Sequence, residues 1–115
     1  MATLFDEAEL LERIDHDWEF LGETVDMLAA DGPALVQEVR QALDARDAAA
    51  VGRAAHTLKG MVANFCAAPA QASALELEKM GKAGDLSNAP PVVAALEAQL
   101  QALTEQLQAL VARGH

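Results

Sequence analysis

The segment Arg53-Ala-Ala-His56-Thr-Leu-Lys59-Gly60 sets a ring nitrogen, two cations and a bare backbone position at helical spacing. In a helix, residues three or four apart share a face, so Arg53 and Lys59 flank His56 by about one turn on either side. Histidine readily offers an uncharged ring nitrogen near neutral pH. The residue types therefore predict a nucleophilic imidazole, with two cations in reach of any anionic group that it accepts.

Gly60 lies one turn after His56, in what reads as the interior of a helix. Glycine there costs roughly 1 kcal/mol of helix propensity relative to alanine, so the position needs a reason. We expect that reason to be clearance, because the absence of a side chain at Gly60 lets a bulky partner approach His56.

A helix over residues 48–66 would put the functional stripe beside a buried one. The apolar residues recur at spacings of three and four, which is typical of a helix that buries one face: Val51, Ala55, Leu58, Val62 and Phe65. About 100° around the helix runs the second, solvent-facing stripe: Gly52, Arg53, His56, Lys59, Gly60 and Ala63.

These residues resemble the signature of histidine-containing phosphotransfer (HPt) domains, which reads roughly Ala-His-x-Leu-Lys-Gly followed by an Asn-x-Gly-Ala-like end. The resemblance covers nearly the whole chain. Downstream, the family's next helix ends in a Leu-Glu…Gly-Arg-x-Gly-Asp-Leu pattern, which is similar to Leu77-Glu78 and Gly81-Lys82-Ala83-Gly84-Asp85-Leu86 here. One position departs from the pattern: Cys66 stands where the family usually has glycine, so the turn after the His56 helix is expected to differ.

The resemblance implies a phosphocarrier rather than an enzyme. A receiver domain's phospho-aspartate would donate a phosphoryl group to Nε2 of His56, which would pass it to another receiver. Lys59 would stabilise the phosphoryl group, Arg53 would be an auxiliary cation, and Gly60 would leave room. In that family the receiver supplies Mg²⁺ and the catalytic groups, so we expect no metal and no cofactor in this chain.

The expected partners are receiver domains of response regulators, including those of hybrid histidine kinases. By family analogy the docking face combines the first helices with the His56 helix, and Met61 and the outward-facing one of Leu10 and Leu11 are candidates for it. We expect a monomer that docks through an apolar patch rather than by its overall charge. The resemblance names neither the donor nor the acceptor receiver.

Composition sets the limits within which this interpretation holds. The chain of 115 residues is 52 % hydrophobic but 3 % aromatic, which favours helices over strands, and its length predicts a single domain over residues 1–115. A net charge of −10 argues against nucleic-acid binding. No apolar run approaches the roughly 18 residues of a membrane span, and the lone Cys66 fits a reducing cytoplasm.

The amphipathic segments predict an all-α fold, an antiparallel four-helix bundle with a short extra N-terminal helix packed over one end. Asp6, Asp17 (or Asp15) and Asp47 are candidate N-caps. The apolar seam that starts at Trp18 keeps its phase across Gly32-Pro33, so we expect one long bent helix there rather than two. Pro69 suits the first turn of a further helix, whose inner face consists mainly of small residues: Ala70, Ser73, Ala74, Leu77 and Gly81.

Two other classes of helical bundle are excluded by single residues. A di-iron bundle needs Glu-x-x-His pairs, but Arg53 and Arg13 precede His56 and His16 by three. A c-type haem site needs two cysteines, and the chain has one. The remaining alternative is a scaffold bundle that only binds partners, in which His56 would be an ordinary solvated residue.

Overall fold

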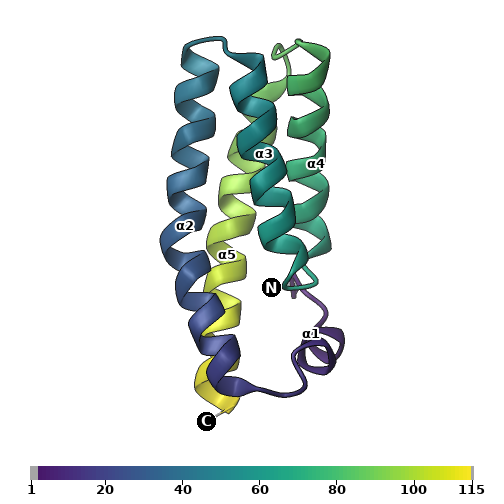
Figure 1. Ribbon diagram of the computed structural model, residues 1–115, viewed down its shortest axis with the longest axis vertical. Coiled ribbons are helices and arrows are strands. Elements are labelled where there is room, and N and C mark those ends of the chain that lie inside the picture. Colours follow the sequence, from purple (N-terminus) through teal and green to yellow (C-terminus); the bar gives the residue numbers. More distant parts are fainter. Residues whose placement is uncertain (1–2, 115) are drawn as a thin grey trace.

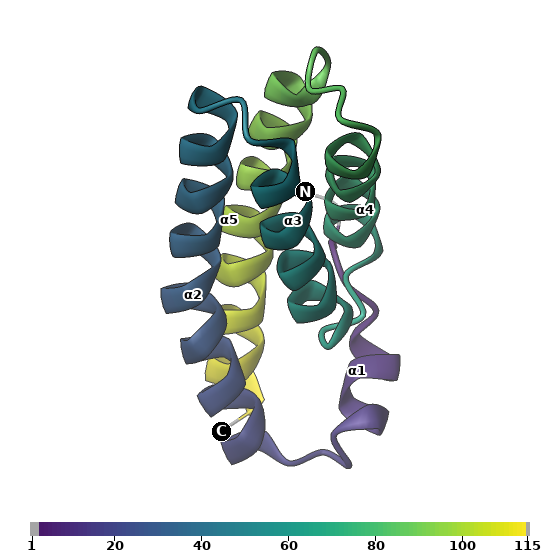
Figure 2. The ribbon, with the colours of Figure 1, turned by 45° about the horizontal axis from the view of Figure 1, so that its top comes forward.

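The protein folds into five helices, as described for residues 3–114 by a computed structural model (Figure 1). They are α1 (Glu7–Arg13), α2 (Trp18–Asp44), α3 (Ala48–Ala63), α4 (Ala68–Ala83) and α5 (Ala89–Gly114). No strand occurs within the described range. Helices α2 to α5 form an antiparallel bundle, and α1 lies across one end of it (Figures 1 and 2). The molecule as a whole measures 44 × 24 × 20 Å. The predicted fold class is confirmed.

Each long helix packs against two neighbours. Helix α3 lies between α2 and α4, and α5 lies between α2 and α4 on the other side, so α3 and α5 are diagonal (Figure 2). The first helix is attached to the bundle at the α3–α4 connection. The Asp6 amide donates to the Cys66 carbonyl at 3.1 Å, and Arg13 Nη1 donates to the Ala63 carbonyl at 2.9 Å.

Aspartates start three of the helices, as the sequence predicts. The side chains of Asp6, Asp17 and Asp47 each accept a hydrogen bond from the backbone amide three residues later, at 3.0 to 3.1 Å. Each bond satisfies an amide that the first helical turn leaves without a partner. These local bonds determine where α1, α2 and α3 begin.

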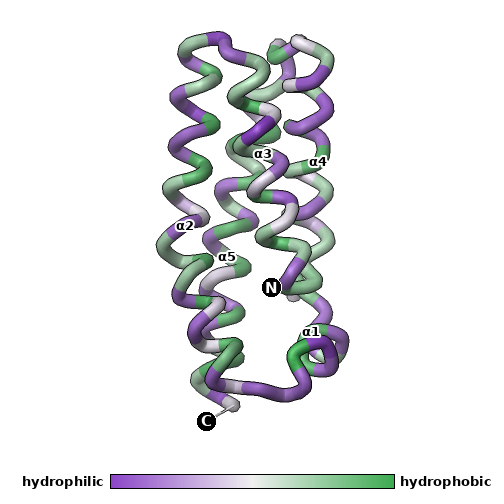
Figure 3. The backbone as a smooth tube through the Cα atoms, viewed as in Figure 1, coloured by the Kyte–Doolittle hydropathy of each residue, from purple (hydrophilic) through white to green (hydrophobic). Residues whose placement is uncertain are grey.

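The predicted seams form one continuous core. Along each helix, hydrophobic and hydrophilic positions alternate (Figure 3). Helix α5 contributes the largest share of leucine to it. The fully buried large side chains recur at spacings of three and four along their helices, and they include Leu21, Leu28, Leu58, Leu77, Leu96, Leu103 and Leu107. Within residues 3–114, none of the helices has a stretch long and apolar enough to cross a lipid bilayer.

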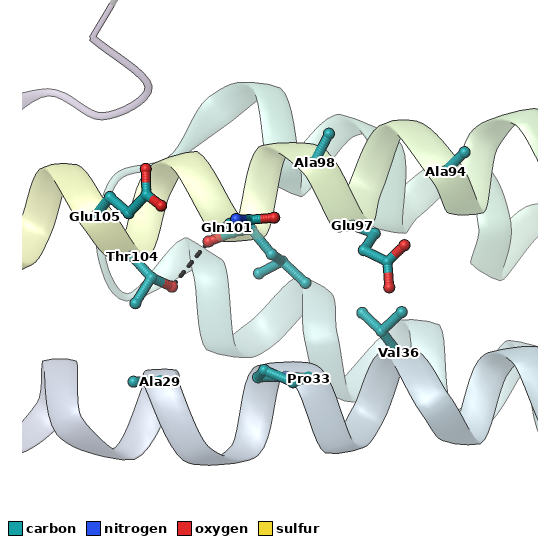
Figure 4. A pocket seen from close by; sticks show the side chains of 11 residues that line it. Ala29, Pro33, Val36, Ala94, Glu97, Ala98, Gln101, Thr104 and Glu105 are labelled. Atoms are coloured by element: carbon teal, nitrogen blue, oxygen red, sulfur yellow. Dashed lines mark hydrogen bonds between the residues drawn. The ribbon is translucent and has the colours of Figure 1, made fainter.

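Helix α2 continues through Pro33 as one helix of 27 residues, as the phase of its seam predicts. Proline lacks an amide hydrogen and removes one helical hydrogen bond. Here Pro33 lies at a groove of about 500 Å³ between α2 and α5, where Ala29, Ala94 and Ala98 are also small (Figure 4). The Arg40–Glu97 ion pair, at 2.5 Å, links the same two helices at one end of this groove.

Cys66 adopts a backbone conformation that favours glycine. Its φ is +56°, in the left-handed region, where a side chain costs about 1–2 kcal/mol. The expectation that this turn differs from the one formed by the family's usual glycine stays a prediction. The cysteine adopts a left-handed φ itself, and its carbonyl still accepts the bond from Asp6.

Helices α3 and α4 come into backbone contact at two glycines. A Cβ atom added to Gly81 would lie 2.6 Å from the Gly52 amide nitrogen and 2.7 Å from the Ala48 carbonyl oxygen. No side chain fits at Gly81 unless the helices move apart. The small inner face predicted for α4 thus allows the close approach expected from its sequence.

We expect Gly81→Ala to lower the free energy of unfolding by roughly 1–3 kcal/mol, because the methyl group overlaps backbone atoms that cannot rotate away. Gly60→Ala is the matched control. Nothing lies within 4 Å of a Cβ at Gly60, so that variant should gain up to about 1 kcal/mol of helix propensity. Urea titrations of both variants test this; a Gly81→Ala protein as stable as Gly60→Ala would contradict the contact.

Candidate functional site

His56 lies on the side of α3 that faces α4, one turn beyond the glycine contact. The helices are antiparallel, so a step of four residues from Gly52 to His56 corresponds to a step of three from Gly81 back to Glu78. The close contact therefore places His56 opposite Glu78. The histidine side chain keeps 67 % of its surface exposed, whereas that of Glu78 keeps 4 %.

Glu78 is the centre of a small polar cluster. One carboxylate oxygen, Oε2, lies 2.6 Å from Nδ1 of His56, and the other, Oε1, accepts a hydrogen bond from Lys59 Nζ at 2.6 Å. Lys82, one turn further along α4, lies 3.6 Å from Oε2. Among residues 3–114, Glu78 is the single charged residue that is buried, and both of its carboxylate oxygens have partners.

This cluster keeps Glu78 ionised. The hydrogen bond from Lys59 is the largest cause that lowers the pKa of Glu78, burial opposes it, and the bond with His56 and the charge of Lys82 lower it further. The result is a fall from 4.5 to about 2. An ionised carboxylate only accepts hydrogen bonds, so the proton in the short contact belongs to Nδ1 of His56. In the neutral ring, Nε2 then carries the free lone pair, on the exposed side.

Lys59 is more enclosed than the sequence indicates. The prediction placed it on a solvent-facing stripe, but only 27 % of its side chain is exposed, and its amine is tied to Glu78. Gly52, on the same stripe, is buried against Gly81. The prediction of a uniformly solvent-exposed stripe is therefore wrong, because α4 approaches α3 closely enough to cover part of it.

A shallow hollow of about 750 Å³ opens beside the imidazole. Arg53 from α3 and Lys82 from α4 line it together with His56. Both cations are exposed, and within the described residues the guanidinium of Arg53 makes no ion pair. Lys79 is also exposed but is not among the hollow's lining residues. An anion bound beside His56 would meet positive charge from two helices.

Gly60 faces open space one turn after His56. Nothing lies within 4 Å of where its Cβ would be. The packing of this chain therefore does not require glycine at this position, in contrast to Gly81.

A second, apolar groove of about 710 Å³ runs between α1, α2 and α3; we call it the docking groove. Phe20 and Met27 on α2 are 49 % and 61 % exposed there. Thr57 lines both the docking groove and the hollow beside His56, so the two surfaces are continuous. The apolar side chains that line the groove are Leu10, Ile14, Phe20, Leu21, Met27, Leu28, Met61 and Phe65.

The sequence candidates for this surface are only partly placed there. Met61 is half-buried and lines the groove. Leu10 is buried, and Leu11 is half-buried without lining the groove. Phe20 and Met27 lie outside the α2 seam and were not singled out from the sequence.

The role of Glu78 was also missed, although the sequence carries a signal for it. Glu78 stands four residues after Ala74 and three before Gly81, within the stripe of small residues predicted to face α3. A carboxylate in a buried stripe must have partners, because an unpaired buried charge is strongly unfavourable. The two basic groups nearest in helical register, His56 and Lys59, are those partners.

Comparisons with known proteins identify the family of the chain. The model of the Hpt domain family matches residues 23–110. In structure the chain is similar to histidine-containing phosphotransfer protein B (HptB) from Pseudomonas aeruginosa PAO1, with a TM-score of 0.90 and 23 % sequence identity over 98 % of each chain; at that identity the likeness shows a shared fold. No curated protein sequence matches. Since the family model covers more than half of the chain, the protein belongs to the Hpt domain family, whose members carry phosphoryl groups on histidine in phosphorelays.

Proposed function

We propose that this protein accepts a phosphoryl group on His56 from the phospho-aspartate of one receiver domain and passes it to the aspartate of another. The observation that carries this proposal is the 2.6 Å contact between His56 Nδ1 and the ionised Glu78. It holds the ring proton on the inner nitrogen and leaves the lone pair of Nε2 pointing to the exposed side, where a partner can reach it.

All the bonds that form and break in the transfer belong to His56 and to the receiver's phospho-aspartate. The lone pair of Nε2 attacks phosphorus, the bond from phosphorus to the aspartyl oxygen breaks, and a free carboxylate leaves on the receiver. The imidazole then holds a positive charge, because Nδ1 keeps its proton, and the carboxylate of Glu78 lies 2.6 Å away to compensate it. We expect the receiver to supply Mg²⁺ and the catalytic groups, and this chain to act as a carrier.

Three cations are available to the transferred phosphoryl group. Lys59 is held close to the ring through their shared partner Glu78. Arg53 and Lys82 line the hollow beside His56. Charge-assisted hydrogen bonds from such groups to phosphoryl oxygens are among the stronger ones in proteins. We assign Lys59 the main stabilising role and Arg53 an auxiliary one.

The docking groove is the surface on which we place the receiver. It is apolar, two of its large side chains are substantially exposed, and through Thr57 it continues to the hollow beside His56. A receiver seated on it would bring its aspartate over the Nε2 side of the ring. Gly60 faces open space on the exposed side of α3, and we assign it the role of admitting the partner.

His56→Gln should fold normally and accept no label from a receiver domain phosphorylated with radiolabelled acetyl phosphate, because the glutamine amide has no nucleophilic ring nitrogen. His16→Asn is the matched control, since His16 is exposed and has a left-handed φ of +56° that asparagine tolerates. Acid-labile label on the His56→Gln protein would sink the assignment. A scaffold bundle, the alternative, predicts that the wild-type protein takes up no label either.

Gly60→Gln should slow transfer from the phosphorylated receiver while leaving the protein at least as stable as wild type. The new side chain would project into open space, so only an incoming partner would meet it, and glutamine has better helix propensity than glycine. Gly60→Ala should show a smaller effect on rate. Quenched time courses of phosphotransfer to wild type, Gly60→Ala and Gly60→Gln measure the three rates. Equal rates would show that Gly60 has no steric role.

Glu78→Gln should flatten the acid side of the pH–stability profile. The folded-state pKa of Glu78 is depressed to about 2 from 4.5, so its contribution is fully present above pH 4.5 and is lost as the pH falls towards 2. Urea unfolding between pH 7 and pH 2 should thus separate wild type from variant near neutrality and bring them together in acid.

Glu78→Leu should change the tautomer of the His56 ring more than Glu78→Gln does. The amide oxygen of glutamine still accepts the Nδ1 proton, whereas leucine leaves Nδ1 without an acceptor. Nitrogen NMR of the His56 ring should report a mainly Nε2-unprotonated tautomer in wild type and Glu78→Gln, and a mixture in Glu78→Leu. A wild-type tautomer ratio in the leucine variant would show that Glu78 does not set it.

A further inference from the structure

The charge of this protein is divided along the chain. Residues 1–47 hold 13 of the 18 acidic side chains and 3 of the 8 basic ones, whereas residues 48–115 hold five of each. The whole net charge of −10 therefore belongs to the first 47 residues. Between residues 14 and 39 there are seven carboxylates and no lysine or arginine. The net charge alone predicts no attraction to a receiver, but it does not show how unevenly the charges are distributed.

Part of this acidic stretch lies at the docking groove. Asp15 and Asp31 line it. Glu23 follows Phe20 by three residues and precedes Met27 by four, so it lies beside both exposed side chains on the surface of α2. All three carboxylates are exposed, and none of them makes an ion pair within residues 3–114. We call Asp15, Glu23 and Asp31 the acidic rim.

The other end of the same surface is positive. Arg53 and Lys82 line the hollow next to His56, and Lys59 is paired with Glu78, the carboxylate that also contacts His56. A partner that covers the groove and the hollow together therefore faces cations around the histidine and the unpaired carboxylates of the acidic rim around the apolar patch. Arg13 also lines the groove, but its guanidinium is paired with Glu9 and with the Ala63 carbonyl. Unpaired charges of one sign at the edge of an apolar patch favour a partner of the opposite sign there and disfavour one of the same sign.

Building on the proposed function, we propose that the acidic rim selects among receiver domains. The receivers that it favours carry lysine or arginine around the apolar patch that covers Phe20 and Met27. A receiver with acidic residues at that edge meets like charges and is rejected, although its phosphorylation site is chemically the same.

The mechanism of selection is electrostatic and acts before and during contact. Opposite charges at an interface rim raise the association rate more than they lengthen the complex's lifetime. Such attraction is screened, because the Debye length falls from about 10 Å at 0.1 M salt to about 3 Å at 1 M. Transfer from a favoured receiver should consequently slow as salt is added.

The test uses receiver domains encoded in the source genome, each phosphorylated with radiolabelled acetyl phosphate. Transfer to the wild-type protein is timed at a limiting receiver concentration, and the fastest receiver is retained. Glu23→Lys/Asp31→Lys should slow its transfer by roughly tenfold, and Glu23→Gln/Asp31→Asn by less. Adding 0.5 M NaCl should slow wild type and speed the reversed variant, because salt screens attraction in the first and repulsion in the second.

The matched control is Glu76→Lys/Glu105→Lys, which changes the net charge by the same amount on exposed positions of α4 and α5 away from the docking groove. It should transfer within about twofold of wild type, since its charges lie outside the rim. Equal slowing in both double variants, or no slowing in either, would contradict the proposal that the acidic rim selects receivers. It would leave the proposed transfer to His56 unaffected. If no receiver labels the wild-type protein, the proposed function falls and the acidic rim with it.

Discussion

The backbone contact between Gly52 and Gly81 is the constraint on which the site depends. With a Cβ at Gly81 the helices would have to separate, because the nearest atoms are backbone and cannot rotate away. The contact holds α3 and α4 close and in register, so the residue one turn along each helix meets its counterpart. That residue is His56 on α3 and Glu78 on α4. Two glycines without chemistry of their own thus position the two groups that have it.

Glu78 shows why a bundle keeps a charge in its interior. Burial disfavours the ionised carboxylate, and a hydrophobic residue of similar size often packs as well or better. Here the hydrogen bond from Lys59 outweighs the effect of burial on the pKa, and the second oxygen faces Nδ1 of His56. One carboxylate therefore orients the ring and holds a cation beside it, two tasks that no apolar side chain performs.

Helix α2 serves the core and the surface with different faces. Its buried side chains continue the seam from Leu21 to Val39, while Phe20 and Met27 remain exposed at the groove shared with α1 and α3. The acidic residues of the same helix stand beside those two apolar side chains. Because the core needs only one face of the helix, the opposite face is free to carry charges that suit a partner.

The sequence by itself determined the features that depend on neighbours along the chain. Aspartate caps at Asp6, Asp17 and Asp47, and the three-and-four spacing of the seams, are local, and they predicted the helices, the bundle and the stripe that holds His56. Tertiary structure decided the rest: that the buried Glu78 contacts His56, that most of the Lys59 side chain is covered, and that Leu10 is buried. His56 and Glu78 are 22 residues apart. Their meeting depends on the distance and register between two helices, and no periodicity within either helix specifies those quantities.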